Sequence, residues 1–253
     1  HALVNAVAGS GKTWTLVEAS KLLRTNRALF CAFNKHIQEE LCRRLPKHVT
    51  VKTLHGIGYS ALASVWGKLR VNEDKVLDLA EKPAKAIHRK LERLLIAEAR
   101  QTGEDIEVPD LGEVSGWLRK LVHFCRASLT PHTDAEALAK MSGYYGIEVE
   151  PCVWEDVAKA TAGIVEASIL MAREQKLVDF DDMVFLPVHL RIAPARYDWV
   201  CLDEAQDLSA AQRALAISCL APGGRMLAVG DPRQSIQGFA GADPESFQSL
   251  KVE

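Results

Sequence analysis

Short runs of apolar residues, each followed by polar or glycine-rich residues, recur at both ends of the 253-residue chain. They occupy residues 2–7, 28–33, 199–202 and 226–229, with a weaker fifth run at 49–52. Nearly continuous apolar runs of this length are typical of strands in a parallel sheet covered on both faces. Helically spaced apolar residues follow several of the runs, so the pattern predicts the α/β class.

The pattern changes in the middle of the chain. Residues 65–151 are rich in helix formers and spaced leucines, and contain no convincing buried strand. A further helical pattern, at about 153–175, leads back to the sheet-forming part. We therefore expect residues 1–64 and 152–253 to form one α/β domain, and residues 65–151 to form an all-helical insertion.

Composition narrows the function only a little. The formal net charge is −2, so a nucleic-acid partner must contact a local patch and not a global basic field. No apolar run is long enough to span a bilayer, which predicts a cytoplasmic protein with no membrane partner. The six cysteines form no C-x-x-C pair, which suits a reducing compartment and argues against structural zinc.

The stretch VNAVAGSGKT, residues 4–13, ends like a phosphate-binding loop, although Ala6 stands where the strict pattern has its first glycine. An apolar strand precedes GSGKT and a helical pattern follows it, as this type of loop requires. Glycine can turn successive backbone amides inward, and the start of the helix adds positive charge. The candidate ATP contacts are Gly9, Ser10, Gly11, Lys12 and Thr13. Lys12 would reach the β- and γ-phosphates and Thr13 would ligate Mg²⁺.

Two later strands end in polar residues that suit the same chemistry. In YDWVCLDEAQD, the strand delivers Asp203 and Glu204 to its carboxyl end, where open parallel sheets bind ligands. Asp203 can hold Mg²⁺ and Glu204 can act as general base, although a solvated acidic turn is the alternative. After MLAVG, Gln234 can contact a γ-phosphate oxygen, or it is an ordinary turn residue.

In this order, the segments GSGKT, LDEAQD and GDPRQSIQGF resemble motifs of the UvrD/Rep-like superfamily 1 DNA helicases. CAFNKHIQEEL and VKTLHGIGYSAL resemble the family's motifs Ia and Ib, and LVDFDDMVFLPV resembles the stretch that precedes its acidic strand. The helical middle lies where the family carries its 1B insertion. The resemblance implies a RecA-like P-loop domain, called 1A, that binds ATP, Mg²⁺ and single-stranded DNA. It also explains Ala6, because alanine is common there in the family.

The resemblance assigns roles to individual residues. It implies a catalytic set of Lys12, Glu204 and Gln234, a nucleotide-contact set that includes Asp203 and Gln234 with the loop, and Thr13 and Asp203 on the metal. It implies DNA contacts at Asn34, Lys35, Thr53 and His55, and a base stacked on Phe239. Gln237 and Ala240 depart from the family's third motif, and Phe33 occupies the usual threonine position of motif Ia. Basic residues outnumber acidic ones between Lys35 and Lys52, which suits either a phosphate backbone or a solvated helix face.

The function expected from the family is the ATP-binding and DNA-gripping half of a helicase or translocase that moves 3′ to 5′. The family's upstream glutamine motif and its second RecA-like domain, 2A, which supplies arginine fingers, are not recognised here, so we expect no unwinding by this chain alone. The expected partners are single-stranded DNA or a single-strand/duplex junction, and domain 2A. Two alternatives stay open, a P-loop kinase for a small molecule, and a nucleotide-regulated DNA-binding or scaffold module without ATPase activity.

Overall fold

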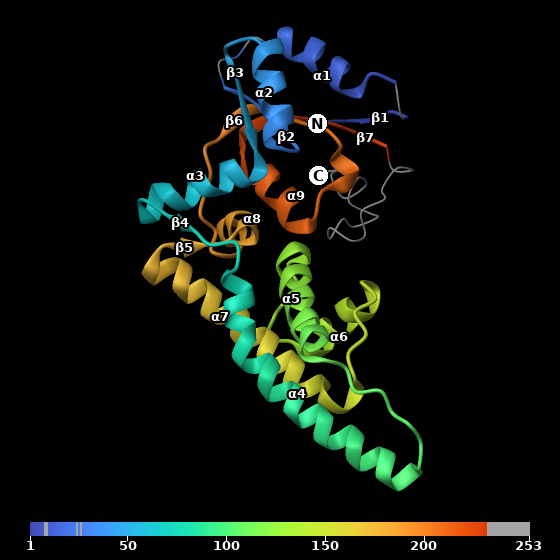
Figure 1. The fold of residues 1–253 in the computed structure, drawn as a ribbon. Helices are drawn as coiled ribbons and strands as arrows, with labels where there is room; N and C mark the ends of the chain where they lie inside the picture. The colour runs from blue at the N-terminus through green and yellow to red at the C-terminus, as the bar shows by residue number, and fades with distance from the viewer. Residues whose placement is uncertain (8–9, 24, 26, 232–253) are drawn as a thin grey trace. The chain divides into compact units, whose positions relative to one another are not determined.

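The computed structural model describes residues 1–7, 10–23, 25 and 27–231. The described elements, in chain order, are β1 (Ala2–Asn5), α1 (Lys12–Lys21), β2 (Ala28–Ala32), α2 (Lys35–Arg44), β3 (Val49–Thr53), α3 (Leu54–Trp66), β4 (Arg70–Val71), α4 (Lys75–Thr102), α5 (Leu111–Ser128), α6 (Ala135–Tyr144), η1 (Pro151–Val153), α7 (Trp154–Gln175), β5 (Leu177–Val178), α8 (Phe180–His189), β6 (Tyr197–Leu202), η2 (Ala205–Asp207), α9 (Ala210–Ser218) and β7 (Leu220–Gly230) (Figure 1). The chain divides into two compact units. The first comprises His1–Gly67 and the chain from Met183 onward, and the second is Lys68–Asp182.

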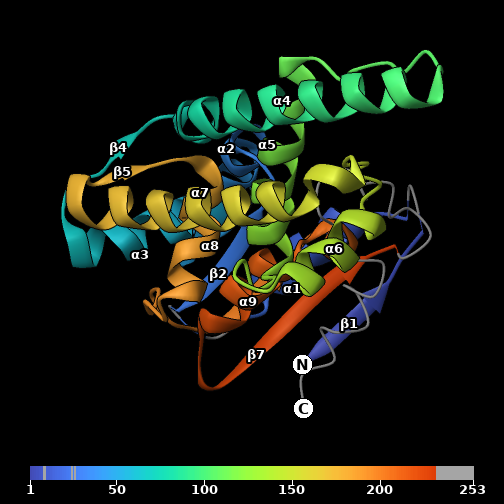
Figure 2. The same cartoon turned by 90° about the horizontal axis from the view of Figure 1, so that it is seen from below.

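The first unit is built on a five-stranded sheet in the order β1-β7-β6-β2-β3, in which every neighbouring pair is parallel. This confirms the α/β class and the five predicted strands, including the weaker one at β3. Figure 2 shows the long β7 beside β1. Because all strands run the same way, their carboxyl ends lie at one edge. β7 separates the strand of the phosphate loop from the strand of the acidic pair.

Helices cover both faces of this sheet. Alternate residues of β2 point to one face, where Ala28, Phe30 and Ala32 join a buried cluster with Leu16 of α1 and Leu41 of α2. In Figure 1, α9 lies on the other side of the sheet from α1 and α2. All five residues of β2 are buried, as expected of a strand covered on both faces.

Helix α3 is packed so closely that one position accepts only glycine. A Cβ built on Gly58 would lie 1.6 Å from the carbonyl oxygen of Met183. We expect Gly58→Ala to lower the free energy of unfolding by about 3 kcal/mol or more, since the backbone of Met183 must move. Gly163→Ala in α7, where no heavy atom lies within 4 Å of the built Cβ, is the control. It should be neutral or stabilise by up to about 1 kcal/mol. Equal urea midpoints for the two variants would contradict this packing.

The second unit is mainly helical. Helices α4, α5 and α7 pack against one another, and α6 packs on α5 and α7. Apolar side chains at helical spacing fill its core, among them Leu91, Leu118, Leu121 and Val157. The short strands β4 and β5 pair in parallel. Among the described helices, none combines the length and apolar character that crossing a membrane requires.

The second boundary of this unit differs from the expected one. The helical unit extends to Asp182 and not to residue 151, because α7 contacts α4 and α5. The first boundary falls at 67/68, close to the expected 64/65. The apolar spacing predicted a helix at about residues 153–175, but spacing alone does not show which elements a helix packs against.

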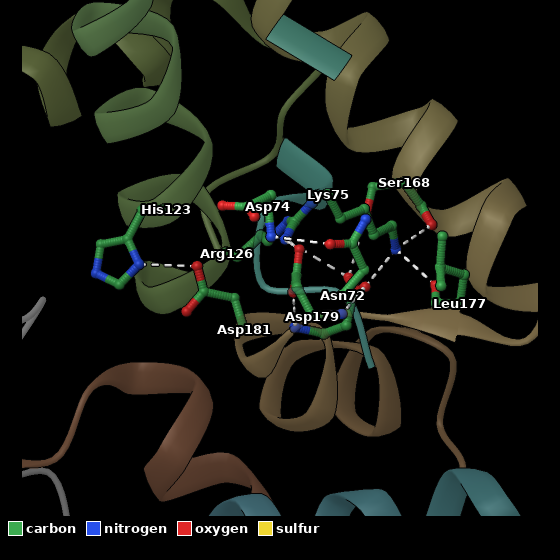
Figure 3. A network of polar contacts seen from close by, with 10 residues as sticks. Asn72, Asp74, Lys75, His123, Arg126, Ser168, Leu177, Asp179 and Asp181 are labelled. Atoms are coloured by element: carbon green, nitrogen blue, oxygen red, sulfur yellow. Dashed lines mark hydrogen bonds and ion pairs between the residues drawn. The ribbon is translucent and has the colours of Figure 1, made fainter. Parts of the chain in front are cut away.

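A buried charge network lies within the second unit (Figure 3). Lys75 pairs with Asp182 and donates to the carbonyl oxygens of Ser168 (2.9 Å) and Leu177 (3.0 Å). Arg126 Nη1 lies 2.8 Å from Asp179 Oδ2 and 3.5 Å from Asp182 Oδ1. Burial opposes both charges of the first pair, as it lowers the pKa of Lys75 and raises the pKa of Asp182. Each buried charge of the network is therefore stable only while its oppositely charged partner is present.

At the edge of this network, His123 Nδ1 lies 2.8 Å from Asp181 Oδ2 (Figure 3). The hydrogen bond to Asp181 raises the pKa of His123, against the effects of burial and Arg126, and Asp179 adds to the rise. A folded-state pKa above the unfolded value means that the pair stabilises the fold most below about pH 6.5. That contribution is lost as the pH rises through the folded-state pKa.

We therefore expect the stability advantage of the wild-type chain over His123→Gln to shrink between about pH 5.5 and pH 8.5. Because both side chains are more than a third exposed, the change should amount to only a few tenths of a kcal/mol up to about 1 kcal/mol. Urea denaturation of both proteins across this range measures it. An advantage that is constant or grows with pH would contradict the assignment.

Candidate functional site

The start of α1 presents the phosphate-loop residues at the carboxyl edge of the sheet. Gly11 caps the helix with φ 80° and ψ 34°, a left-handed conformation that glycine adopts without strain. Lys12 and Thr13 form the first turn of the helix. Upstream, the Ser10 amide donates to the Val7 carbonyl at 3.2 Å. Helix α1 therefore begins directly after the loop, and the backbone N–H groups at its amino end are of the kind that bind phosphate.

Lys12 contacts a carboxylate that is far away in the sequence. Its Nζ lies 2.7 Å from Glu204 Oε2, although 192 positions separate the residues. The Lys12 side chain is 8% exposed and that of Glu204 is 37% exposed. A nearly buried ammonium needs an anionic partner, which is Glu204 here. A phosphate oxygen is the kind of group that could take its place.

Thr13 and Asp203 form the second cross-link between these segments. Thr13 Oγ1 donates to Asp203 Oδ2 at 2.5 Å, and the Glu204 amide donates to Asp203 Oδ1 at 3.0 Å. Burial raises the pKa of Asp203, the Thr13 hydroxyl opposes the shift, and the charge of Glu204 adds to it. Glu204 adopts φ 49° and ψ 45°, an unusual conformation for glutamate that turns the chain sharply after β6. The two loops therefore bring a lysine, a hydroxyl and two carboxylates together.

The donor set fits Mg²⁺ and a triphosphate. Hydroxyl and carboxylate oxygens are the ligands that Mg²⁺ prefers, and it commonly binds through one or two carboxylates together with phosphate oxygens and water. A site completed by the nucleotide needs few protein ligands. The described ranges contain no cluster of three or more His, Cys, Asp or Glu side chains placed to hold a metal by themselves. Thr13 and Asp203 would hold the metal, and Lys12 would face the phosphates.

Sequence reasoning assigned no role to Gln206, which lies at the same place. Its side chain is buried, and Nε2 donates to Glu204 Oε2 at 2.9 Å and to Asp207 Oδ2 at 3.1 Å. Gln206 stands within the DEAQD segment, two positions after Glu204. The sequence shows only a glutamine two positions after an acidic pair. That its side chain is buried and its amide donates to Glu204 is seen only in the fold.

The four described residues predicted to contact DNA lie at or just after the carboxyl ends of β2 and β3, which are at the same edge of the sheet. Asn34 Oδ1 accepts from the Ile37 amide at 2.9 Å and caps α2, and Thr53 Oγ1 accepts from the Gly56 amide at 3.1 Å and caps α3. Lys35 is exposed and His55 is half-buried. In the structure, Asn34 and Thr53 each cap a helix. Whether they also contact DNA stays a prediction. The other three predicted site residues, Gly9, Gln234 and Phe239, lie outside the described residues.

Comparison with known proteins agrees with this geometry. The family model for the UvrD/REP helicase N-terminal domain matches residues 1–253. The chain belongs to this family. Its parallel sheet with a phosphate loop after β1 and an acidic pair after β6 is the fold expected of a UvrD/REP N-terminal domain.

Relatives of the UvrD/REP domain include ATP-dependent DNA helicases. The chain is 26% identical over 269 residues to F-box DNA helicase protein 1 of Schizosaccharomyces pombe, covering 96% of this chain and 27% of the relative. It is 23% identical over 280 residues to ATP-dependent DNA helicase Rep of Buchnera aphidicola subsp. Baizongia pistaciae, covering 98% and 36%. A 55-residue stretch is 51% identical to one chain of the ATP-dependent helicase/nuclease of Lacticaseibacillus casei, covering 21% and 4%. The chain thus spans between about a quarter and about a third of the length of the first two relatives.

Proposed function

We propose that this chain is the ATP-binding and single-stranded-DNA-binding part of an ATP-dependent helicase or translocase that moves 3′ to 5′. One observation carries the proposal: Lys12 contacts Glu204, and Thr13 contacts Asp203, across about three quarters of the sequence. A phosphate-loop lysine and a paired acidic motif that meet at the carboxyl ends of parallel strands are the parts of an NTP-hydrolysing site. Unwinding further requires a second RecA-like domain, which we propose as the partner of this one.

The contacts suggest how the site works. In the structure, Lys12 neutralises Glu204, so the carboxylate is held by an ammonium group. When Lys12 turns to the β- and γ-phosphates, Glu204 becomes available to accept a proton from the attacking water. Bound Mg²⁺ would neutralise charge on the phosphates. Thr13 Oγ1 and Asp203 Oδ2 already lie 2.5 Å apart, so both residues would need little rearrangement to hold the same metal ion.

The DNA contacts follow from the shared edge of the sheet. Lys35 is exposed at the start of α2, close in sequence to the end of β2. A lysine there can neutralise a backbone phosphate without reading sequence, which suits a protein that moves along a strand. Thr53 and His55, at the start of α3, extend the proposed track to the next strand.

Nucleotide binding tests the first half of the proposal. Titration with Mg²⁺ and a fluorescent, non-hydrolysable ATP analogue should give a Kd that Lys12→Ala raises by about 10- to 100-fold, since a charge-assisted contact is lost. Lys21→Ala is the matched control, because Lys21 ends the same helix and pairs with Glu18 on the surface. A Kd that the two substitutions change equally would overturn the nucleotide role of the loop. A phosphorylated small-molecule product would instead favour a kinase.

DNA binding tests the second half. Fluorescence polarisation with a labelled oligothymidylate should show an affinity that falls with salt, and Lys35→Ala should reduce the slope of log K against log salt by about 0.7 to 1. Lys21→Ala, at the far end of α1 from the carboxyl edge, should leave the slope unchanged. Unchanged slopes for both variants would remove Lys35 from the DNA track. If DNA binds but a separately supplied second RecA-like domain restores no ATP hydrolysis, a nucleotide-regulated binding module is the better description.

A further inference from the structure

Gln206 is a buried amide that uses both of its ends at the site edge. Its side chain is 2% exposed, on the short helix η2 that follows the turn at Glu204. Nε2 donates to Glu204 Oε2 at 2.9 Å, and Oε1 accepts from the Asp231 amide at 3.0 Å. Asp231, also 2% exposed, directly follows β7. The side chain therefore bridges the turn after β6 and the end of the neighbouring strand β7.

One oxygen of the Glu204 carboxylate accepts two hydrogen bonds, and the bond from Gln206 is the one that can hold the carboxylate when the other is lost. Lys12 and Gln206 both donate to Oε2. In the proposed function, Lys12 leaves Glu204 when it engages phosphate. The neutral amide of Gln206 is attracted to phosphate more weakly than the Lys12 ammonium, and its Oε1 also accepts from the Asp231 amide, so it can keep its bond to Glu204 and hold the carboxylate in place. Without that bond, a side chain that is 37% exposed is free to rotate.

The bond to Asp231 fixes the amide itself. The Gln206 side chain cannot rotate without losing bonds at both ends, and a buried amide left without hydrogen-bond partners is strongly unfavourable. A displacement of the β7 end therefore moves the amide, and the amide moves the Glu204 carboxylate. β7 is the strand between β1 and β6, so its end lies between the phosphate loop and the acidic pair in the order of strands.

We propose that Gln206 is a positioning residue for ATP hydrolysis, which fixes the Glu204 carboxylate and couples its position to the carboxyl end of β7. This inference rests on the proposed function. A purely structural role for the same side chain predicts lower stability alone. A positioning role predicts a loss of kcat at unchanged nucleotide affinity.

The test uses Gln206→Glu in this chain, supplied with the proposed second RecA-like domain. The substitution keeps an oxygen for the Asp231 amide and replaces the NH₂ donor with an oxygen that faces Glu204 and Asp207. We expect the kcat of DNA-stimulated ATP hydrolysis to fall by about 10- to 100-fold, as a misplaced catalytic group does, while the Kd of the non-hydrolysable analogue stays within about twofold. If Gln206→Glu does not fold, Gln206→Met is used instead, because methionine has a similar length and no amide. It should likewise lower kcat and leave the Kd of the analogue unchanged.

Gln212→Ala is the matched control, because Gln212 is a nearby glutamine with a structural task, the capping box of α9 with Ser209. It should lower the melting temperature and leave kcat unchanged. A wild-type kcat in folded Gln206→Glu or Gln206→Met, or a kcat that falls only in parallel with stability as in Gln212→Ala, would overturn the positioning role. In combination with Glu204→Gln, Gln206→Glu should lower kcat no further.

The same experiment separates this inference from the proposed function. If Glu204→Gln abolishes hydrolysis and the Gln206 variants do not affect it, only the positioning role fails. If Glu204→Gln itself hydrolyses ATP at the wild-type rate, the assignment of the base fails first.

Discussion

Replacing Glu204 with glutamine is expected to lower the kcat of ATP hydrolysis by about 10²- to 10⁴-fold, the usual contribution of a general base. The substitution preserves the size of the side chain and removes its ability to take a proton. Nucleotide affinity should be kept or increased, because Lys12 loses the carboxylate that now lies 2.7 Å away and competes with phosphate for it. Steady-state ATP hydrolysis on single-stranded DNA by this chain supplied with the proposed second RecA-like domain, with analogue binding in parallel, measures both effects.

Glu18→Gln is the control for this result. Glu18 lies on α1, pairs with Lys21 on the surface, and is 41% exposed. Its replacement should change neither kcat nor affinity. A loss of kcat in Glu18→Gln as large as that in Glu204→Gln, or a Glu204→Gln enzyme with full activity, would contradict the role given to Glu204.

A second large effect is expected for the buried network of the helical unit. Lys75→Met should lower the free energy of unfolding by about 3–5 kcal/mol, because it leaves Asp182 buried without its lysine partner. The lost bonds to the carbonyl oxygens of Ser168 and Leu177 act in the same direction. Combining Lys75→Met with Asp182→Leu should recover a large part of the loss, since the uncompensated charge is then removed. Urea denaturation followed by circular dichroism gives the three free energies.

Lys85→Met provides the comparison within the same helix. Lys85 pairs with Glu81 at the surface of α4, with both side chains about half-exposed or more, and its loss should cost no more than about 0.5 kcal/mol. If Lys75→Met proves as mild as Lys85→Met, the buried pair contributes nothing to stability and the interpretation of Figure 3 is wrong.

The strands, and the meeting of the candidate site residues at one edge of the sheet, could be predicted because both depend on local sequence signals. Apolar runs of strand length mark β2 and β6 directly, and the glycines before Lys12 mark a loop between a strand and a helix. The convergence of Lys12 with Glu204 followed from a general property of parallel sheets, whose carboxyl ends share one edge.

Other features could not be predicted because they depend on packing between distant segments. Lys75 and Arg126 look like solvated helix charges in the sequence, yet the fold buries both against aspartates more than 50 positions away. The extension of the helical unit to Asp182 depends on which helices α7 contacts. The sequence shows a glutamine at position 206, but only the fold shows that it hydrogen-bonds Glu204 and Asp207 in its own turn and the Asp231 amide after β7.

Local structure also complicates the DNA prediction. Asn34 and Thr53 stand immediately before α2 and α3, where asparagine and threonine are favoured as caps for a purely structural reason. The motif resemblance and the capping preference select the same residues. Binding measurements on Lys35, which has no capping task, therefore distinguish the two explanations better than substitutions of the caps.

The most direct measurement is a crystal structure of the chain with Mg²⁺ and a non-hydrolysable ATP analogue. The account predicts the triphosphate at the amino end of α1, Lys12 moved from Glu204 to the β- and γ-phosphates, and the metal on the Thr13 hydroxyl with Asp203 beside it. A nucleotide bound at another edge of the sheet, or a bound triphosphate with the Lys12–Glu204 pair intact, would contradict it.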